Sequence, residues 1–205
     1  VNSDGSYNDG FTSGSGTAEY VTVNLSLPTT SSGMLVYADY GASVTRAANA
    51  LWIPLAEKAY AQWNQTGQEG RNGTNSYAGI ESGWMATVDA QILGHNATDY
   101  MMSRATEQEL IAAVQNGLAV TIGTNSADAD GLYGSHAYAV TGYNATTDTF
   151  TLYNPWGFAQ PGQLTWSQLT ADCDAFCTVN AGGATPIRGA VQHAGAIGFF
   201  ASDSI

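Results

Sequence analysis

Two runs of residues with strand character flank one short polar turn, and this pattern constrains the local fold more than any other in the chain. The runs cover residues 136–143 and 149–156, and the turn is centred near Thr146. Such a pattern predicts an antiparallel hairpin. Opposed side chains in such a pair have Cβ atoms about 4.5–5.5 Å apart, and diagonal neighbours lie about 7–8 Å apart. His136, at the start of the first arm, and Asn154, near the end of the second, are therefore predicted to reach each other.

Helix signals occur in three other places. Apolar residues at helical spacing predict a helix over residues 48–63, with Pro54 in its first turn, where proline is tolerated. A short helix is expected within residues 77–93. Thr106 and Glu109 form a capping-box pattern for a third helix, which is expected to end at residues 116–117.

The remaining strand and loop signals complete an α+β prediction. Residues 1–18 are rich in Gly, Ser, Asn and Asp and are expected to be a flexible lead-in, so that the folded unit covers residues 19–205. Strands are expected at residues 20–27, 34–40, 118–124 and 194–201. Residues 163–169 follow the hairpin and lead into a segment that holds both cysteines, and no internal repeat or second domain is indicated.

The charge of the chain excludes several classes of partner. The 205 residues carry a formal net charge of −12, with Lys58 the sole lysine beside four arginines. A basic surface for nucleic acid or anionic lipid is therefore not expected, and no apolar run approaches the roughly 20 residues of a membrane helix. The chain starts at Val1 rather than at Met, which suggests that upstream sequence is missing. The low lysine content leans towards a bacterial source, with secretion left open.

The predicted contact between His136 and Asn154 has a known chemical use. An amide oxygen that accepts from one imidazole nitrogen fixes the tautomer of the ring and directs the other nitrogen outward. That arrangement is the base and orienting residue of a catalytic triad, and Trp156 would lie beside the pair. The spacing alone also fits a histidine that is simply hydrogen-bonded in a sheet.

Several motifs, in the order in which the family has them, resemble the calpain family of cysteine peptidases. Residues 134–142, Gly-Ser-His-Ala-Tyr-Ala-Val-Thr-Gly, are similar to the family's strand that carries its catalytic His, and residues 152–157, Leu-Tyr-Asn-Pro-Trp-Gly, are similar to its Asn-bearing strand end. Residues 51–61 resemble the family's W-x-x-L-L-E-K-A-Y-A-K helix. Residues 77–83 are similar to its Y-E-x-L-x-x-G segment, and the resemblance spans residues 20 to about 170.

The resemblance implies a papain-like fold of two subdomains, of which this chain would be the sheet-rich second one, with a twisted antiparallel sheet and flanking helices. His136 would be the general base and acid, Asn154 would orient it, and Trp156 would cover the pair. Ser135 departs from the pattern, because the family has Gly before its His. The family's nucleophilic cysteine follows a Q-x-x-x-D-C-W-type pattern that is absent here, so the thiol is expected from an upstream half or a separate chain.

The two cysteines present are not expected to replace that thiol. Cys173 lies between Asp172 and Asp174, and neighbouring carboxylates oppose formation of a thiolate. Cys173 and Cys177 are therefore interpreted as structural residues. His95 and His193 receive no chemical role.

No metal or other cofactor is predicted. Animal calpains bind calcium through acidic loops that flank the active site, but the residues after Gly157 lack those acidic side chains. Asp128 and Asp130 precede the histidine strand and could contact a hard cation, yet two aspartates fall short of the 6–8 oxygen ligands that calcium takes.

The function predicted from the sequence is thus part of a calpain-like cysteine endopeptidase that acts on proteins or peptides and is inactive by itself. The alternative is a non-catalytic peptide-binding or regulatory module with the same fold. Transglutaminase-type and bacteriocin-processing hydrolases also use Cys and His, but they usually orient the His with Asp. The segment Asn-Pro-Trp-Gly at residues 154–157 argues against the first class and is weaker evidence against the second.

Overall fold

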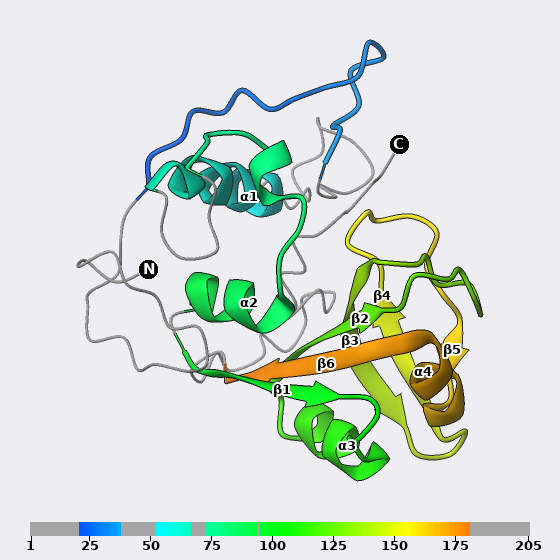
Figure 1. The fold of residues 1–205 in the computed structure, drawn as a ribbon. Helices are drawn as coiled ribbons and strands as arrows, with labels where there is room; N and C mark the ends of the chain where they lie inside the picture. The colour runs from blue at the N-terminus through cyan, green and yellow to red at the C-terminus, as the bar shows by residue number, and fades with distance from the viewer. Residues whose placement is uncertain (1–20, 38–51, 67–72, 94, 181–205) are drawn as a thin grey trace.

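The protein is described by a computed structural model that places residues 21–37, 52–66, 73–93 and 95–180. Within these ranges the chain forms an antiparallel six-stranded sheet in the order β1-β6-β2-β3-β4-β5, with helices on both faces (Figure 1). The α-helices are α1 Trp52–Trp63, α2 Met85–Leu93, α3 Glu107–Gln115 and α4 Trp166–Asp172. Short 3₁₀ helices are η1 Asn64–Thr66 and η2 Ala78–Ile80. The strands are β1 Ala97–Met101, β2 Ala119–Thr124, β3 Ala137–Asn144, β4 Thr149–Tyr153, β5 Gln163–Leu164 and β6 Cys173–Val179.

A hydrophobic core lies on each face of the sheet, which makes the fold a three-layer α+β arrangement. On one face α2 packs against β6, β1 and β2, and α1 and η2 belong to the same hydrophobic cluster, whose strand residues are small, such as Ala119, Ala137 and Ala175. On the other face α3 and α4 cover larger side chains, including Phe150 and Phe176. Small residues on the first face let the helices approach closely, whereas the second face is filled by aromatic and branched groups.

Three of the four α-helices among the described residues lie in the segments where the sequence signals predict helices, and α4 was not predicted. The structure has α1 over Trp52–Trp63, inside the predicted range, and places α2 in the second predicted segment. The predicted capping box of α3 is present, because the Thr106 hydroxyl accepts from the Glu109 N–H and the Glu109 carboxylate accepts from the Thr106 N–H. A second capping box, Thr165 with Gln168, starts α4 inside the segment expected after the hairpin.

Strand β6 contains both cysteines and pairs with β1 on one side and β2 on the other. Neither β6 nor β1 was assigned as a strand from the sequence. β6 is buried on both faces, so its residues lack the alternation of polar and apolar side chains that marks a half-buried strand.

The predicted hairpin is confirmed. Strands β3 and β4 pair with Ala139 opposite Tyr153 and Asn144 opposite Thr149, with a register shift between Val140 and Gly142. Continuing this register beyond Tyr153 carries the chain to Asn154, beside the segment that enters β3. The hairpin therefore brings His136 and Asn154 to the same end of the two strands.

The predicted early strands are wrong for the residues that can be seen. Residues 21–27 and 34–37 form no strand, and a single antiparallel bridge joins Thr29 to Leu35. Among the described residues no strand pairs with this segment beyond that bridge, and two of its apolar side chains are largely exposed, Leu25 at 81% and Met34 at 58%.

Two predictions concern parts of the chain outside the described residues. The flexible lead-in at residues 1–18 and the strand at residues 194–201 both lie there. In the ranges that are placed, no helix combines the length and the apolar character needed to cross a membrane.

Candidate active site

His136 and Asn154 are in direct contact, as the hairpin predicts. His136 immediately precedes β3, and Asn154 immediately follows β4. The imidazole Nε2 of His136 lies 3.0 Å from Oδ1 of Asn154, and both residues are buried, at 4% and 0% exposure. In a buried setting this hydrogen bond is little weakened by competing water.

The surroundings of the Asn154 amide decide which ring nitrogen carries hydrogen. The amide nitrogen Nδ2 donates to the carbonyl of Ala159 at 3.3 Å, and Oδ1 accepts from the backbone N–H of Trp156 at 3.1 Å. Because backbone groups cannot exchange donor for acceptor, they fix the amide with its oxygen towards His136. Nε2 must then be the donor, which leaves Nδ1 of the neutral ring as the proton acceptor.

The backbone of His136 is held by Thr124 at the end of β2. The Thr124 hydroxyl accepts from the His136 N–H at 2.9 Å, and the Thr124 N–H donates to the His136 carbonyl at 2.9 Å. Ser135 donates its N–H to the Asn125 carbonyl at 2.6 Å. These bonds fix the backbone that carries the imidazole. They come from the end of β2 and the residue after it, which the sequence did not associate with the site.

Ser135 has a φ of +55°, in the left-handed region that glycine adopts most readily. Serine at this position, where the calpain pattern has glycine, therefore carries a strain of about 1 kcal/mol. The preceding Gly134 is constrained by space, because a Cβ atom there would lie 2.7 Å from the carbonyl group of Ser126.

Aromatic rings surround the imidazole, as was expected for Trp156. The Trp156 ring lies 4.3 Å from the His136 ring between centroids, tilted by 33°. Tyr138 meets the imidazole edge-on at 4.8 Å. Tyr133 and Phe158 pack on Trp156 at 4.8 and 5.7 Å. The imidazole of His136 is thus in contact with the rings of Trp156 and Tyr138.

Gln160 is a residue of this site that sequence reasoning missed. Its side-chain Oε1 accepts from the Asn154 N–H at 2.8 Å, and its Nε2 donates to the Asn154 carbonyl at 3.1 Å. A glutamine six residues after the asparagine follows no pattern that would single it out, because the contact depends on the path of the intervening loop.

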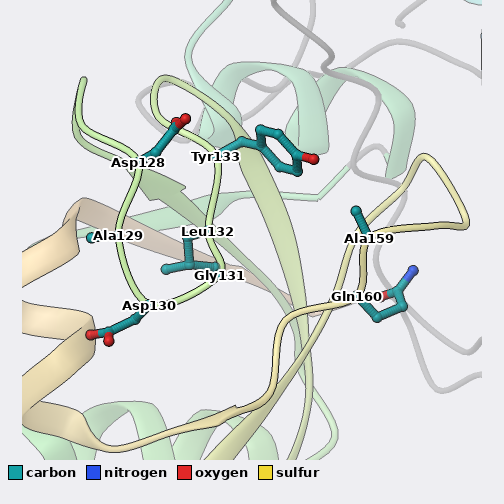
Figure 2. Close-up of a pocket in the computed structure, with 8 residues that line it drawn as sticks. All are labelled: Asp128, Ala129, Asp130, Gly131, Leu132, Tyr133, Ala159 and Gln160. Carbon is teal, nitrogen blue, oxygen red and sulfur yellow. The ribbon is translucent and has the colours of Figure 1, made fainter.

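A pocket of about 380 Å³ opens beside the site. Gln160 and Ala159 line it on one side, and residues 128–133 line it on the other (Figure 2). Asp128 lies in this wall and accepts from the Gly134 N–H at 2.6 Å. Asp130, also in this wall, neighbours Asp172 at the end of α4. Burial, together with Asp130, raises the pKa of Asp172 above its usual value.

The aspartates of this loop do not assemble a metal site by themselves. Across the parts of the chain that are placed, no group of three or more His, Cys, Asp or Glu side chains gathers around a point that could hold an ion. Asp128 is committed to the Gly134 N–H, so one of its oxygens already serves the backbone of the loop.

The two cysteines are unsuited to act as nucleophiles. Both lie buried in β6. Burial, followed by the charges of Asp172 and Asp174, raises the pKa of Cys173 to about 12. A thiol with that pKa is ionised in about one molecule in 100,000 at pH 7. Burial and the Asp89 carboxylate raise the pKa of Cys177 well above its usual value.

Of the other two histidines, only His95 is among the described residues. His95 is exposed, and His193 lies outside the described residues.

A model of the calpain family of cysteine proteases matches residues 4–174. The chain belongs to the calpain family. The match covers most of the 205 residues and includes His136, Asn154 and Trp156. No curated protein gives a significant match to the chain. The match shows a calpain-like cysteine peptidase domain, and the antiparallel sheet with flanking helices is compatible with the papain-like α+β fold that membership implies.

Proposed function

We propose that this calpain-family chain supplies the His and Asn of a cysteine endopeptidase that hydrolyses peptide bonds by a Cys-His-Asn mechanism. The observation that carries the proposal is the buried bond between His136 Nε2 and Asn154 Oδ1. It fixes the ring with Nδ1 as the acceptor, which a base needs if it is to take a proton from a thiol.

In the proposed reaction His136 first accepts the proton of a cysteine thiol through Nδ1. The thiolate attacks the peptide carbonyl carbon, and the imidazolium then donates its proton to the leaving amine as the carbon–nitrogen bond breaks. A water molecule, deprotonated by the same nitrogen, hydrolyses the thioester and restores the thiol. Asn154 keeps the ring in one orientation through both proton transfers, and Trp156 shields the bond between them.

The thiol would come from a complementary half-domain that docks against the His136 end of the sheet, either on the same polypeptide or on a separate chain. The high pKa values of Cys173 and Cys177 support an external source. In this arrangement the chain is the second subdomain of a papain-like fold, and it is inactive alone. Its partners are the Cys-bearing half and a protein or peptide substrate, while the charge of −12 disfavours nucleic acid.

The direct test joins this chain to a Cys-bearing half and measures peptide cleavage. General acid–base catalysis contributes about 10²–10⁴-fold to a rate, so His136→Ala is expected to lower kcat by at least that range. Asn154→Ala is expected to lower kcat less, because the ring remains but loses its fixed tautomer. His95→Ala, at an exposed histidine, is the matched control and should leave the rate unchanged. An assembled protein that cleaves peptides equally well after His136→Ala would end the proposal.

The non-catalytic module makes a different prediction for the same assembly. It would bind peptide without cleaving it, and His136→Ala would leave cleavage at zero and binding intact. The family match, to cysteine proteases, does not favour this alternative.

A further inference from the structure

We propose that Gln160 is a positioning residue, which holds the backbone of Asn154 so that the Asn154 amide fixes the tautomer of His136. The catalytic consequence rests on the proposed function, but the effect on the histidine ring does not. Gln160 touches neither the imidazole nor any reacting group, so it acts through Asn154.

Asn154 needs such a partner because it lies just past the end of the β3–β4 ladder. The last paired residue of β4 in that ladder is Tyr153, and β5 pairs only with residues 150 and 151. No neighbouring strand therefore serves the Asn154 N–H, which is buried. Gln160 supplies an acceptor for this N–H and a second donor, beside the Gly157 N–H, for the Asn154 carbonyl.

The bonds between the two ends of this loop are reciprocal. The side-chain amide of Gln160 binds the backbone of Asn154, while the side-chain amide of Asn154 binds the carbonyl of Ala159. Ala159 has a φ of +49°, a left-handed conformation that is unfavourable for an L residue. Loss of the Gln160 amide would leave the Asn154 N–H buried without an acceptor and would free the loop to relax.

That relaxation would reach His136 directly. The direction of the Asn154 side chain follows from its backbone, and its Oδ1 is the acceptor that selects Nε2–H on the ring. An Asn154 amide that swings away removes this selection, and the neutral imidazole then distributes its hydrogen over both nitrogens. Because Gln160 is exposed on the wall of the pocket (Figure 2), its replacement removes little buried surface and should leave the fold intact.

The test uses ¹⁵N NMR of the three histidine rings in the full chain at a pH where they are neutral, with His136→Gln identifying the signals of that ring. The wild type should show His136 as a single Nε2–H tautomer. Gln160→Ala should shrink the separation between its Nδ1 and Nε2 shifts towards the tautomeric average. Gln160→Glu keeps an acceptor for the Asn154 N–H but has no donor for its carbonyl, so it should fall between the two.

Gln163→Ala is the matched control. Gln163 is an exposed glutamine three residues further on, and it accepts from the Thr149 hydroxyl at 3.0 Å, away from the histidine. Its replacement should leave the His136 signals unchanged. The proposal is overturned if Gln160→Ala lowers the thermal midpoint while the ring keeps the wild-type tautomer. Should Gln160→Ala fail to fold, a wild-type signature in Gln160→Glu overturns it instead.

A kinetic measurement on the assembled peptidase separates this inference from the proposed function. Gln160→Ala should lower kcat by about 10- to 100-fold with KM changed little, because misplacement of a catalytic group acts on the transition state. If the assembled wild type cleaves nothing, the proposed function fails, while the tautomer shift in Gln160→Ala still supports the positioning role. If the wild-type ring already averages its tautomers, both fail.

Discussion

The thiol of Cys177 donates a 3.0 Å hydrogen bond to the carboxylate of Asp89, which links the interior strand β6 to helix α2. The Thr121 hydroxyl of β2 donates to the same carboxylate oxygen at 2.8 Å. Asp89 is 4% exposed, and burial raises its pKa to about 6, although both hydrogen bonds oppose the rise. The negative charge of the nearby Asp99 on β1 also raises the pKa of Asp89, by a smaller amount.

This buried carboxylate predicts a protein that is more stable at mildly acidic pH. A pKa raised from 3.8 when unfolded to about 6 when folded means that the folded state binds the proton more tightly. The contribution of Asp89 to stability is therefore complete below pH 3.8 and is lost as pH rises through 6, an effect of at most about 3 kcal/mol. Urea denaturation at pH 5 and pH 7.5 measures it.

The variant Asp89→Asn should flatten this dependence, since an amide does not titrate. Asp174→Asn, at the exposed position of β6, is the control and should keep the wild-type slope. An Asp89→Asn protein whose stability changes with pH as steeply as the wild type would contradict the assignment.

Gly134 is predicted to be essential because the loop that precedes β3 passes close to the backbone of Ser126 at this residue. In Gly134→Ala the new Cβ would lie 2.7 Å from backbone atoms of Ser126, and backbone cannot move aside as a flexible side chain can. The expected cost is about 1–3 kcal/mol of unfolding free energy, measured by thermal or urea denaturation. Gly162→Ala, where a Cβ would meet nothing within 4 Å, should cost far less. Equal losses in the two variants would argue against the steric explanation.

Trp156 is predicted to protect the bond between His136 and Asn154 from water. Trp156→Ala should speed exchange of the Nε2 proton of His136 with solvent by at least tenfold, whereas Trp156→Phe should keep part of the cover. The exchange rate is measured by NMR on the isolated chain, so the readout does not depend on activity. Unchanged exchange in Trp156→Ala would show that other groups exclude the water.

Neither cysteine should react with iodoacetamide in the folded chain at pH 7. Both are buried, and the pKa of Cys173 is raised to about 12. Mass spectrometry should find no label after a time in which a urea-unfolded sample is labelled at both sites. Rapid labelling of Cys173 in the folded protein would contradict this prediction and make Cys173 a candidate nucleophile.

The sequence predicted the local parts of the fold and of the site because they depend on short-range rules. The β3–β4 hairpin follows from alternation around a turn, and the α3 capping box follows from the spacing of Thr106 and Glu109. The contact of His136 with Asn154 could be found because both residues belong to one hairpin. Their catalytic role is supported by family membership and stays a prediction.

What the sequence could not reveal depends on the order of the strands. Thr124 reaches His136 because β2 lies next to β3, and Cys177 meets Asp89 because β6 lies between β1 and β2, where α2 packs on it. The predictions of strands at residues 20–27 and 34–40 were wrong because a strand also needs a neighbour to pair with. Their alternating pattern is real, but no neighbouring strand accompanies the parts that are described.

The two strands of the hairpin that carries His136 and Asn154 are joined by a connection of a few residues. The two side chains therefore meet without any long-range closure of the chain. Contacts so near in sequence form quickly, because little loop entropy is lost in making them. The imidazole and its amide can thus meet early in the folding of this chain. Under the proposed function, a thiol supplied by a second half-domain would then meet a base that is already aligned.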